Sequence, residues 1–238
     1  MNSFDLIVVM PVYNEEEIIE TVIDDWNEHL KKLHIKFLIH AYNDGSKDKT
    51  LSVLHILEKK YPHLKTTDKP NSGHGPTILK AYRDNTDADW IFQIDSDNEI
   101  QADNFQKFWE QRDNYDFLIG KRTSRSQPLS RRIVSSISRL TVRLFYSGKI
   151  YDVNSPFRLM RNERFQPLFH SIPADYFAPN VIISGLAGWK KLRTLEIPVI
   201  HVNRQTGSVS IKKWKLLKSA LRSFRQTISY RFSRNGNF

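Results

Sequence analysis

The sequence contains no cysteine among its 238 residues. Disulfide bonds and thiolate metal sites are therefore excluded, and a reducing compartment is compatible with this composition. The chain also has no run of about 18 apolar residues, so we do not expect a membrane-spanning helix. The first segment, MNSFDLIVVMPVYNEEE, lacks the basic start and the long apolar run of a signal peptide. These absences predict a soluble or surface-bound protein.

Several catalytic motifs are missing as well. No pair of histidines has the H-x-x-x-H spacing of a zinc site beside a glutamate, and neither a nucleophile elbow nor a Walker-type loop is present. His74 and His201 lie in segments discussed below, and we interpret both as structurally satisfied or solvated side chains. Zinc-dependent hydrolysis, serine esterase chemistry and P-loop nucleotide hydrolysis are not indicated.

Acidic residues are absent from two long blocks of a chain whose formal net charge is +10. Residues 121–151 contain eight lysines and arginines and no acid, and no Asp or Glu follows Glu196. Such blocks favour an anionic partner, whether a nucleic acid, a lipid headgroup or a phosphorylated substrate. The alternative is that each block is simply a solvated basic surface.

Apolar runs and helix-like stretches alternate through the first half of the chain. The runs FDLIVVM, KFLIHAY, WIFQI and DFLIG predict buried strands. Helices are expected between them at residues 15–31, 49–60, 75–84 and 102–112. This alternation predicts an α/β fold, with a mostly parallel sheet that is flanked by helices on both faces. In the second half we expect a basic helix at 129–146 and a strand within LRTLEIPVI.

The carboxyl-terminal segment IKKWKLLKSALRSFRQTISYRF predicts a basic amphipathic helix. Six apolar side chains recur every three or four residues and share one helical face, while lysines and arginines occupy the others. The six are Ile211, Trp214, Leu217, Leu221, Phe224 and Ile228. A helix of this kind suits an anionic membrane surface. The alternative is that the apolar row packs onto the domain and the basic residues are merely solvated.

Three acids stand at alternate positions directly after the WIFQI strand. In an extended segment, Asp95, Asp97 and Glu99 would point the same way. Unpaired carboxylates that close repel one another unless a cation lies among them. Oxygen ligands favour a hard ion such as Mg²⁺ or Mn²⁺, whose coordination shell is commonly completed by substrate phosphates. The acids therefore predict a metal site that binds a diphosphate.

Two further polar clusters, PVYNEE and NDGS, follow the first two strands. Each alone reads as an ordinary strand exit or turn. Ligands of an open parallel sheet bind beyond the carboxyl ends of its strands. The joint position of these clusters and the acidic segment at such ends therefore predicts one crevice for a polar ligand.

The motifs VVMPVYNEEEII, NDGSKDKT, NSGHGPTILKAY and IDSDNEI, in this order, resemble those of the family 2 glycosyltransferases. The resemblance implies the GT-A, Rossmann-like nucleotide-sugar fold. The later segments SRRIVSSISRL, YDVNSPFRLM and EIPVIHVNRQTG resemble the branch that contains dolichyl-phosphate mannose synthase and bacterial polyprenyl-phosphate glycosyltransferases. On this basis residues 1–210 form one GT-A domain, with a nucleotide-sugar and metal half at 1–120 and an acceptor half at 121–210, followed by the basic amphipathic segment 211–238.

The resemblance also implies roles for individual residues. Donor nucleotide contacts fall on Pro11, Tyr13, Asn14, Glu15 and Asp44. Asp95 and Asp97 correspond to catalytic donor and metal ligands, and Glu99 to a further metal ligand that is commonly Gln. Arginines associated with donor and acceptor phosphates fall on Arg122, which we also count as catalytic, Arg131 and Arg204. The chain departs from the family pattern at Asn43, where an Asp is usual, and in RQTGSVS, whose serines are shifted.

The expected reaction is an inverting, metal-dependent transfer of a sugar from a nucleotide donor. The metal, as Mg²⁺ or Mn²⁺, and the arginines would stabilise the departing diphosphate. Family members that act on hydroxyl groups often carry a Glu-Asp pair late in the chain, where this sequence has Pro179 and Asn180, with Asp175 as the only acid nearby. A phosphate acceptor is already ionised and needs no general base. This favours a polyprenyl phosphate acceptor.

The expected partners are a UDP- or GDP-linked sugar, a phosphorylated lipid and, through the tail, a membrane surface on its cytoplasmic, inner face. One alternative is transfer to a saccharide hydroxyl in surface polysaccharide synthesis. Another is a non-catalytic protein that binds nucleic acid or a sugar nucleotide, since basic residues interleaved with aromatics suit nucleic acids. Acids at the ligand edge would repel nucleic-acid phosphates, so we expect no nucleic-acid partner.

Overall fold

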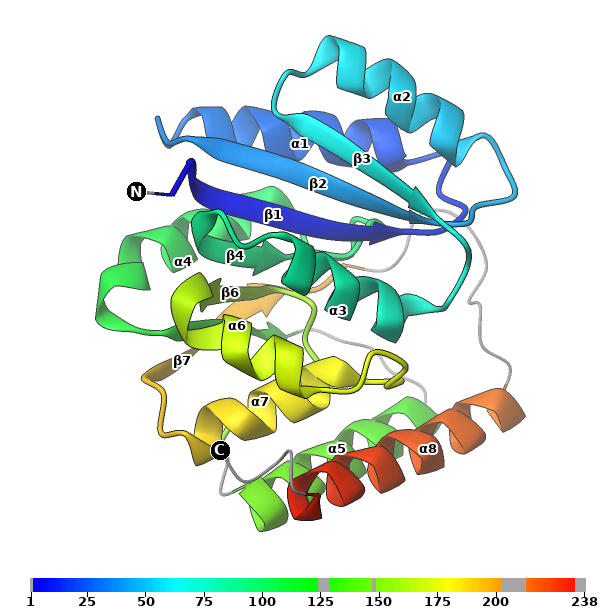
Figure 1. The fold of residues 1–238 in the computed structure, drawn as a ribbon, viewed down its shortest axis with the longest axis vertical. Coiled ribbons are helices and arrows are strands. Elements are labelled where there is room, and N and C mark those ends of the chain that lie inside the picture. Colours follow the sequence, from blue (N-terminus) through cyan, green and yellow to red (C-terminus); the bar gives the residue numbers. More distant parts are fainter. Residues whose placement is uncertain (1, 124–128, 147–148, 203–212, 234–238) are drawn as a thin grey trace.

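The computed structural model describes residues 2–123, 129–146, 149–202 and 213–233, with side chains throughout except in 129–133 and 213–217 (Figure 1). The strands are β1 (Phe4–Val12), β2 (Phe37–Asp44), β3 (Leu64–Lys69), β4 (Ala88–Gln93), β5 (Phe117–Thr123), β6 (Arg158–Arg161) and β7 (Thr194–Ile200). The helices are α1 (Ile19–Lys31), α2 (Thr50–Lys60), α3 (His74–Asp84), α4 (Phe105–Gln111), α5 (Leu129–Tyr146), α6 (Asn162–Ser171), α7 (Pro179–Trp189) and α8 (Lys213–Phe232). Short 3-10 turns, η1 (Ala102–Asn104) and η2 (Arg112–Asn114), flank α4.

The strands form one seven-stranded sheet in the order β3-β2-β1-β4-β6-β5-β7. Neighbours pair in parallel except that β6 runs antiparallel to both β4 and β5. The predicted mostly parallel α/β sheet is therefore confirmed. All strands but β6 end at the same edge, and β6 begins there, so this edge collects loops from every part of the sheet.

Helices cover both faces of the sheet and enclose two hydrophobic cores. In Figure 1, α3, α6 and α7 lie in front of the sheet and α1 lies behind it. In the core beneath α1, Trp26 packs against three phenylalanine rings at centroid distances of 5.4 to 6.0 Å. On the other face Tyr82 stacks on Phe169 at 4.6 Å. Burial of apolar side chains on both faces explains the near-continuous apolar runs of β1 and β4.

Four elements were not predicted from the sequence, namely β3, β6, α6 and α7. Strand β3, LKTTDK, lies at the sheet edge and is mostly polar, and β6 has only four residues. Helix α7, PNVIISGLAGW, is buried on nearly all sides, so its sequence shows no amphipathic period. Helix α1 begins at Ile19, four residues after the expected start, because residues 15–18 form the turn that leaves β1.

Helices α5 and α8 pack side by side beneath α7 (Figure 1). The Tyr146 hydroxyl donates to the Thr227 carbonyl at 2.7 Å, and Ser223, Thr227 and Tyr230 form the buried face of α8. Leu221 and Phe224 are 50% and 38% exposed, so at these positions the expected apolar row does not pack onto the domain. Ile211 lies outside the described residues. Within the described chain no helix is long and apolar enough to cross a membrane.

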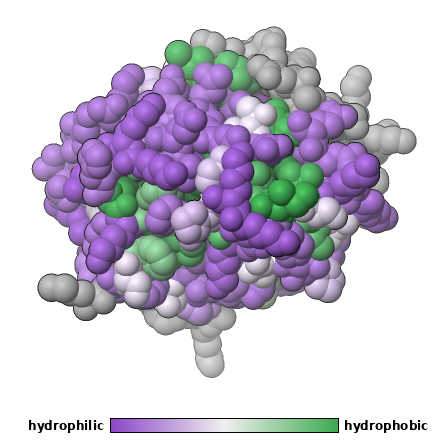
Figure 2. All heavy atoms as spheres, turned by 90° about the horizontal axis from the view of Figure 1, so that it is seen from above, coloured by the Kyte–Doolittle hydropathy of each residue, from purple (hydrophilic) through white to green (hydrophobic). Residues whose placement is uncertain are grey.

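Hydrophilic residues cover most of the side of the molecule opposite to α5 and α8, where hydrophobic residues show only as separate patches (Figure 2). On α5, by contrast, Ile137, Leu140 and Leu144 are all exposed. Their spacing places them on one side of the helix. Both helices of this pair therefore carry exposed apolar side chains.

The start of α3 packs closely against the loop before α7. A Cβ atom added to Gly75 would meet the Phe177 carbonyl oxygen at 2.1 Å, and backbone atoms cannot move aside as a flexible side chain can. We expect Gly75→Ala to lower the free energy of unfolding by about 1–3 kcal/mol. Urea denaturation would measure this, with Lys80→Ala in the same helix as a control that changes stability little. Equal stability of the Gly75→Ala variant and the wild type would contradict this packing.

Candidate functional site

The loops that leave β1 and β2 are tied to each other by hydrogen bonds. The Lys47 amide donates to Asn14 Oδ1 at 2.8 Å, and the Asn14 amide donates to Ser46 Oγ at 3.0 Å. Asn14 has a φ of 54°, a left-handed conformation that Asn tolerates well. Tyr13 and Asn14 are exposed at the edge, whereas Pro11 is buried within β1 and the Glu15 side chain is buried behind the loop. Of this predicted group, Tyr13 and Asn14 are therefore the ones accessible to a ligand.

Asp44, at the end of β2, holds the loop that precedes α3. Its carboxylate accepts the backbone amides of Ser72 at 2.8 Å and Gly73 at 2.9 Å, and it forms an ion pair with Lys69. Burial favours the neutral form of Asp44, but the hydrogen bonds from Lys69 and Ser72 outweigh burial and lower the pKa of the carboxyl group. Asp44 thus positions the loop before α3, and its predicted contact with the nucleotide stays a prediction.

Asn43, which stands where the family pattern has an Asp, is buried, and its side-chain amide both donates and accepts a hydrogen bond. Its Nδ2 donates to Asp68 Oδ1 at 2.6 Å, while its Oδ1 accepts the Ser46 hydroxyl at 2.5 Å. A carboxylate could not make the first of these bonds, because it has no donor and would face another acid. Asp68 on β3 therefore gives a local reason for Asn at this position.

The acidic segment after β4 is not extended as the alternation of its acids suggested. Strand β4 ends at Gln93, a turn follows at residues 96–97, and Asn98 has a φ of 54°. This turn ends the two-residue alternation of side-chain direction. Even so, Asp95, Asp97 and Glu99 all line one pocket, together with Arg122 and His201.

Asp95 lies against a histidine from the first turn of α3. His74 Nε2 is 3.1 Å from Asp95 Oδ1, and Gln93 Nε2 donates to the same oxygen at 3.4 Å. Desolvation opposes ionisation of Asp95, yet the interaction with His74 outweighs it and lowers the pKa of the carboxyl group. The reciprocal interaction with Asp95 overcomes the desolvation of His74 and raises the pKa of its imidazole.

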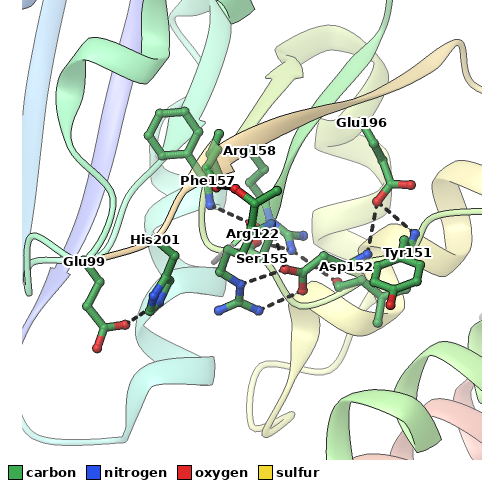
Figure 3. Close-up of polar contacts among 12 residues, drawn as sticks. Glu99, Arg122, Tyr151, Asp152, Ser155, Phe157, Arg158, Glu196 and His201 are labelled. Atoms are coloured by element: carbon green, nitrogen blue, oxygen red, sulfur yellow. Dashed lines mark hydrogen bonds and ion pairs between the residues drawn. The ribbon is translucent and has the colours of Figure 1, made fainter. Parts of the chain in front are cut away.

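Glu99 and His201 join the acidic segment to the end of β7. His201 Nε2 lies 2.8 Å from Glu99 Oε2, and the Val202 amide donates to the Glu99 carbonyl at 2.9 Å (Figure 3). These contacts bring together residues about 100 positions apart. They also hold the end of β7 against the acidic segment.

Arg122, near the end of β5, forms a salt bridge with Asp152. Arg122 Nε and Nη2 donate to the two carboxylate oxygens at 2.7 and 2.8 Å, a bidentate pair that Figure 3 shows. Burial would lower the pKa of Arg122, but its bonds with Asp152 raise it. Glu196 Oε1 in turn accepts the backbone amides of Tyr151 at 2.8 Å and Asp152 at 3.1 Å. The pair therefore holds a fixed guanidinium at the pocket wall.

A buried polar layer lies behind the pocket. Asn180 Nδ2 donates to Gln93 Oε1 at 2.8 Å, and the Tyr82 hydroxyl bonds both of these side chains. The fully buried Arg158 donates to the backbone carbonyls of Val153, Ser155 and Asn180. Burial lowers the pKa of this guanidinium. Asn180 is thus an enclosed amide, and Asp175 is exposed beside α8, where Arg222 bonds its carbonyl.

Within the described residues no group of three His, Asp or Glu side chains is arranged to hold a metal ion. Asp95, Asp97 and Glu99 share a pocket and supply only oxygen donors, which suits a hard cation. Glu99 is directed at His201 and Asp95 at His74, so the three carboxylates do not converge on one point. Of the other predicted arginines, Arg131 lies in the part of α5 described by its backbone, and Arg204 lies outside the described residues.

A larger cavity of about 440 Å³ lies at the opposite edge of the sheet, beside the amino ends of β1 and β4. It is lined by acids and by two arginines, Arg112 and Arg161, each of which stacks on a tryptophan. Because ligands of such sheets bind at the carboxyl ends of the strands, the smaller pocket at Asp95 is the candidate active site.

Comparison with known proteins identifies the family of this chain. The family model described as Glycosyl transferase family 2 matches residues 7–173. The chain belongs to this family. The family 2 resemblance and the prediction of a glycosyltransferase are therefore confirmed.

Curated relatives of this glycosyltransferase include two with named lipid substrates. A bactoprenol glucosyl transferase of Shigella phage SfX is 27% identical over 223 residues, which cover 90% of this chain and 69% of the relative. A dolichyl-phosphate beta-glucosyltransferase of Trichomonas vaginalis is 26% identical over 213 residues, covering 83% of this chain and 65% of the relative. The chain thus spans about two thirds of the length of these relatives.

Solved structures share the fold of this family 2 chain. Mannosyl-3-phosphoglycerate synthase from Rubrobacter xylanophilus aligns with a TM-score of 0.71 and 13% identity over 99% of this chain and 76% of that one. Glucosyl-3-phosphoglycerate synthase from Mycobacterium tuberculosis, in complex with Mn²⁺, UDP and glucosyl-3-phosphoglycerate, aligns with a TM-score of 0.69 and 13% identity over 95% and 80%. The expected GT-A fold is confirmed.

Sequence reasoning missed four side chains of the glycosyltransferase pocket and its wall, which are His74, Gln93, Asp152 and His201. The two histidines stand inside recognised motif segments, but only the fold shows that each faces an acid. Asp152 stands in YDVNSPFRLM, and its pairing with Arg122 spans 30 residues. No local pattern in the sequence predicts such a contact.

The ionisation of Asp44 predicts how the stability of this glycosyltransferase depends on pH. A carboxyl group with a lowered pKa in the folded state contributes stability above its unfolded pKa and loses it as the pH falls through the folded value. We expect the free energy of unfolding to fall below a pH of about 4, and less steeply in Asp44→Asn. At pH 7 this variant should be less stable by about 1–3 kcal/mol.

Denaturant titrations at pH 7 and pH 3 would measure both effects. Asp113→Asn, which changes an exposed carboxylate on η2, is the control and should follow the wild type. Parallel pH profiles for Asp44→Asn and the wild type would contradict the role of this ion pair.

Proposed function

We propose that this glycosyltransferase is an inverting, metal-dependent enzyme that moves a sugar from a nucleotide donor to a polyprenyl phosphate. The observation that carries this proposal is the pocket at the carboxyl edge of the sheet, where the acids Asp95, Asp97 and Glu99 face the fixed guanidinium of Arg122. Such a site suits a ligand that is both phosphorylated and metal-bound.

The donor side of the proposal rests on the acidic segment. Asp95 and Asp97 would hold Mg²⁺ or Mn²⁺, with Glu99 as a further oxygen ligand positioned by His201. A bound divalent ion would neutralise the charge that develops on the leaving diphosphate. Arg122 would stabilise the same charge, and its bidentate bond to Asp152 removes the need to reorganise during the reaction. UDP-linked and GDP-linked sugars are both compatible donors.

The acceptor side of the proposal rests on the position of Asn180. This residue stands where hydroxyl-directed members of the family often carry a catalytic acid, and here it is an amide enclosed by Gln93 and Tyr82. An amide cannot accept a proton from a hydroxyl acceptor, whereas a phosphate acceptor arrives ionised. The named substrates of the relatives, bactoprenol and dolichyl phosphate, support the same choice.

The proposal places the protein at the cytoplasmic, inner face of a membrane. Exposed Ile137, Leu140 and Leu144 on α5 and Leu221 and Phe224 on α8 offer apolar contact on two helices whose sequences are rich in lysine and arginine. Apolar side chains flanked by cations suit an interface with anionic lipid headgroups.

Asp97→Asn should abolish sugar transfer and remove the metal-dependent part of nucleotide binding. The physical reason is that one oxygen ligand loses its charge while the fold is preserved. Thermal stabilisation by UDP and by GDP, each with and without Mn²⁺, would measure binding, because a ligand that binds only the folded state raises its stability. Turnover with a polyprenyl phosphate would measure the reaction.

The control for this experiment is Asp103→Asn, which changes a nearby exposed acid in η1. It should retain both activities. Unaltered turnover in Asp97→Asn would refute the metal assignment. Transfer by the wild type to saccharide hydroxyls but not to prenyl phosphates would favour the alternative acceptor, and nucleotide binding without any transfer would favour a non-catalytic binder.

Replacing Leu221 and Phe224 together by Asn should reduce retention on vesicles that contain anionic lipid, most clearly at low salt. The pair is exposed, so the fold should be unchanged. Sedimentation with such vesicles is the measurement, and Ile56→Asn, on α2 at the distant side, is the matched control. Equal retention of the double variant and the control would show that this face does not bind membrane.

A further inference from the structure

A basic cluster lies one residue outside the Arg122–Asp152 pair. Lys121 precedes Arg122 on β5, and Tyr151 precedes Asp152 in the segment after α5. Lys121 Nζ lies 4.7 Å from the centre of the Tyr151 ring, and the Arg139 guanidinium of α5 lies 3.6 Å from it. Figure 3 shows Tyr151 beside Asp152, on the side away from Glu99 and His201. Half of the Tyr151 surface is exposed, so these two cations meet on an accessible ring.

The charges around this cluster leave it with a net positive character. Two cations so near one ring repel each other unless anions lie close by. The two acids beside this cluster, Asp152 and Glu196, are hydrogen-bonded to other groups. Asp152 is bonded bidentately to Arg122, and Glu196 accepts the amides of residues 151 and 152. In addition, Arg139 Nε is buried with no hydrogen-bond acceptor among the described residues. Such an arrangement favours a bound anion.

Two cations on one exposed ring suit a ligand with a doubly charged head. The exposed apolar row of α5, formed by Ile137, Leu140 and Leu144, lies on another side of the helix from Arg139, so the cluster itself selects the charged head of a ligand. The phosphate monoester of a prenyl lipid meets this description, since its doubly charged head can engage two cations at once.

We propose that Lys121, Arg139 and the ring of Tyr151 form an outer subsite that receives the phosphate of the lipid acceptor beside Arg122. This inference rests on the proposed function. The ring holds both cations in place. Because Tyr151 directly precedes Asp152, the residue that holds Arg122, the subsite lies next to the catalytic guanidinium.

The test uses a short-chain prenyl phosphate below its micelle concentration, so that no membrane is present. Calorimetric binding of this probe to the wild type and to Lys121→Ala/Arg139→Ala measures the subsite directly. We expect the dissociation constant to rise by roughly tenfold or more in the double variant, because two charge-assisted contacts are lost. Nucleotide binding with Mn²⁺ should be unchanged. In turnover, the KM for the prenyl phosphate should rise while the KM for the donor and kcat change little.

Lys149→Ala is the matched control, since it removes an exposed lysine from the same acid-free block two residues before Tyr151. Retained binding in Lys149→Ala, with loss in the double variant, supports the subsite. An equal loss of binding in Lys149→Ala and in the double variant would show that overall charge causes the effect, and it would overturn the subsite. An unchanged dissociation constant in the double variant would also overturn it. Circular dichroism melts of all variants verify that each is folded.

A soluble short-chain phosphatidylglycerol separates the acceptor from bilayer headgroups. Binding of this lipid as tightly as the prenyl phosphate, with the same loss in the double variant, would assign the cluster to headgroups and overturn the acceptor proposal. Binding of the prenyl phosphate by a wild type that transfers no sugar would refute the proposed function and leave the subsite standing. Sugar transfer with an unchanged KM for the acceptor in the double variant would refute the subsite and leave the proposed function standing.

Discussion

The reversed direction of β6 determines what the ligand edge of this glycosyltransferase contains. In a purely parallel sheet, only the segments that follow strands reach the carboxyl edge. Because β6 runs against β4 and β5, the segment before it, residues 149–157, also lies there. That segment supplies Asp152, Pro156 and Phe157 to the pocket and its wall, and it places Arg158 beneath them. The pocket is thus built from segments that follow strands and from one segment that precedes a strand.

The site balances its charges in layers. In the pocket, Asp95 faces His74 and Glu99 faces His201, so these two acids each have a basic neighbour. Beside them Arg122 is paired with Asp152. Below these pairs, Arg158 is solvated by backbone carbonyls instead of a carboxylate. A fixed positive centre under the pocket, together with Arg122, favours the negative charge of bound phosphates, since both donors are already oriented before a ligand arrives.

The same arrangement connects the two proposed substrates. The donor contacts proposed for Asp95 and Asp97 come from the segment after β4, and the acceptor contacts proposed for Lys121, Arg139 and Tyr151 come from β5 and α5. Arg122 stands between them, at the end of β5 and with Asp152 behind it. Phosphates bound on the two sides would therefore meet near one guanidinium, as a direct transfer of the sugar between them requires.

Much of this could be read from the sequence because it is local. Apolar runs bounded by polar turns predicted β1, β2, β4 and β5, and the ordered motifs carried the family resemblance. The position of Asp95, Asp97 and Glu99 at a strand end was also readable, since it follows from where the apolar run stops. Elements without a local signal were missed. Strand β6 is only four residues long, and α7 is buried on nearly every side.

The sequence by itself determined the α/β class, the family and the acids at the ligand edge, because each depends on neighbouring residues and their order. The tertiary structure alone decided which charges pair. The contacts of Asp152 with Arg122, of His201 with Glu99 and of Asn180 with Gln93 join residues from 30 to about 100 positions apart. It also turned the apolar row of α8 outward at Leu221 and Phe224, because the side of α8 that is buried is the one that carries Ser223, Thr227 and Tyr230, with Thr227 bonded to Tyr146 of α5. Such choices depend on which surfaces meet, and a linear pattern does not contain that information.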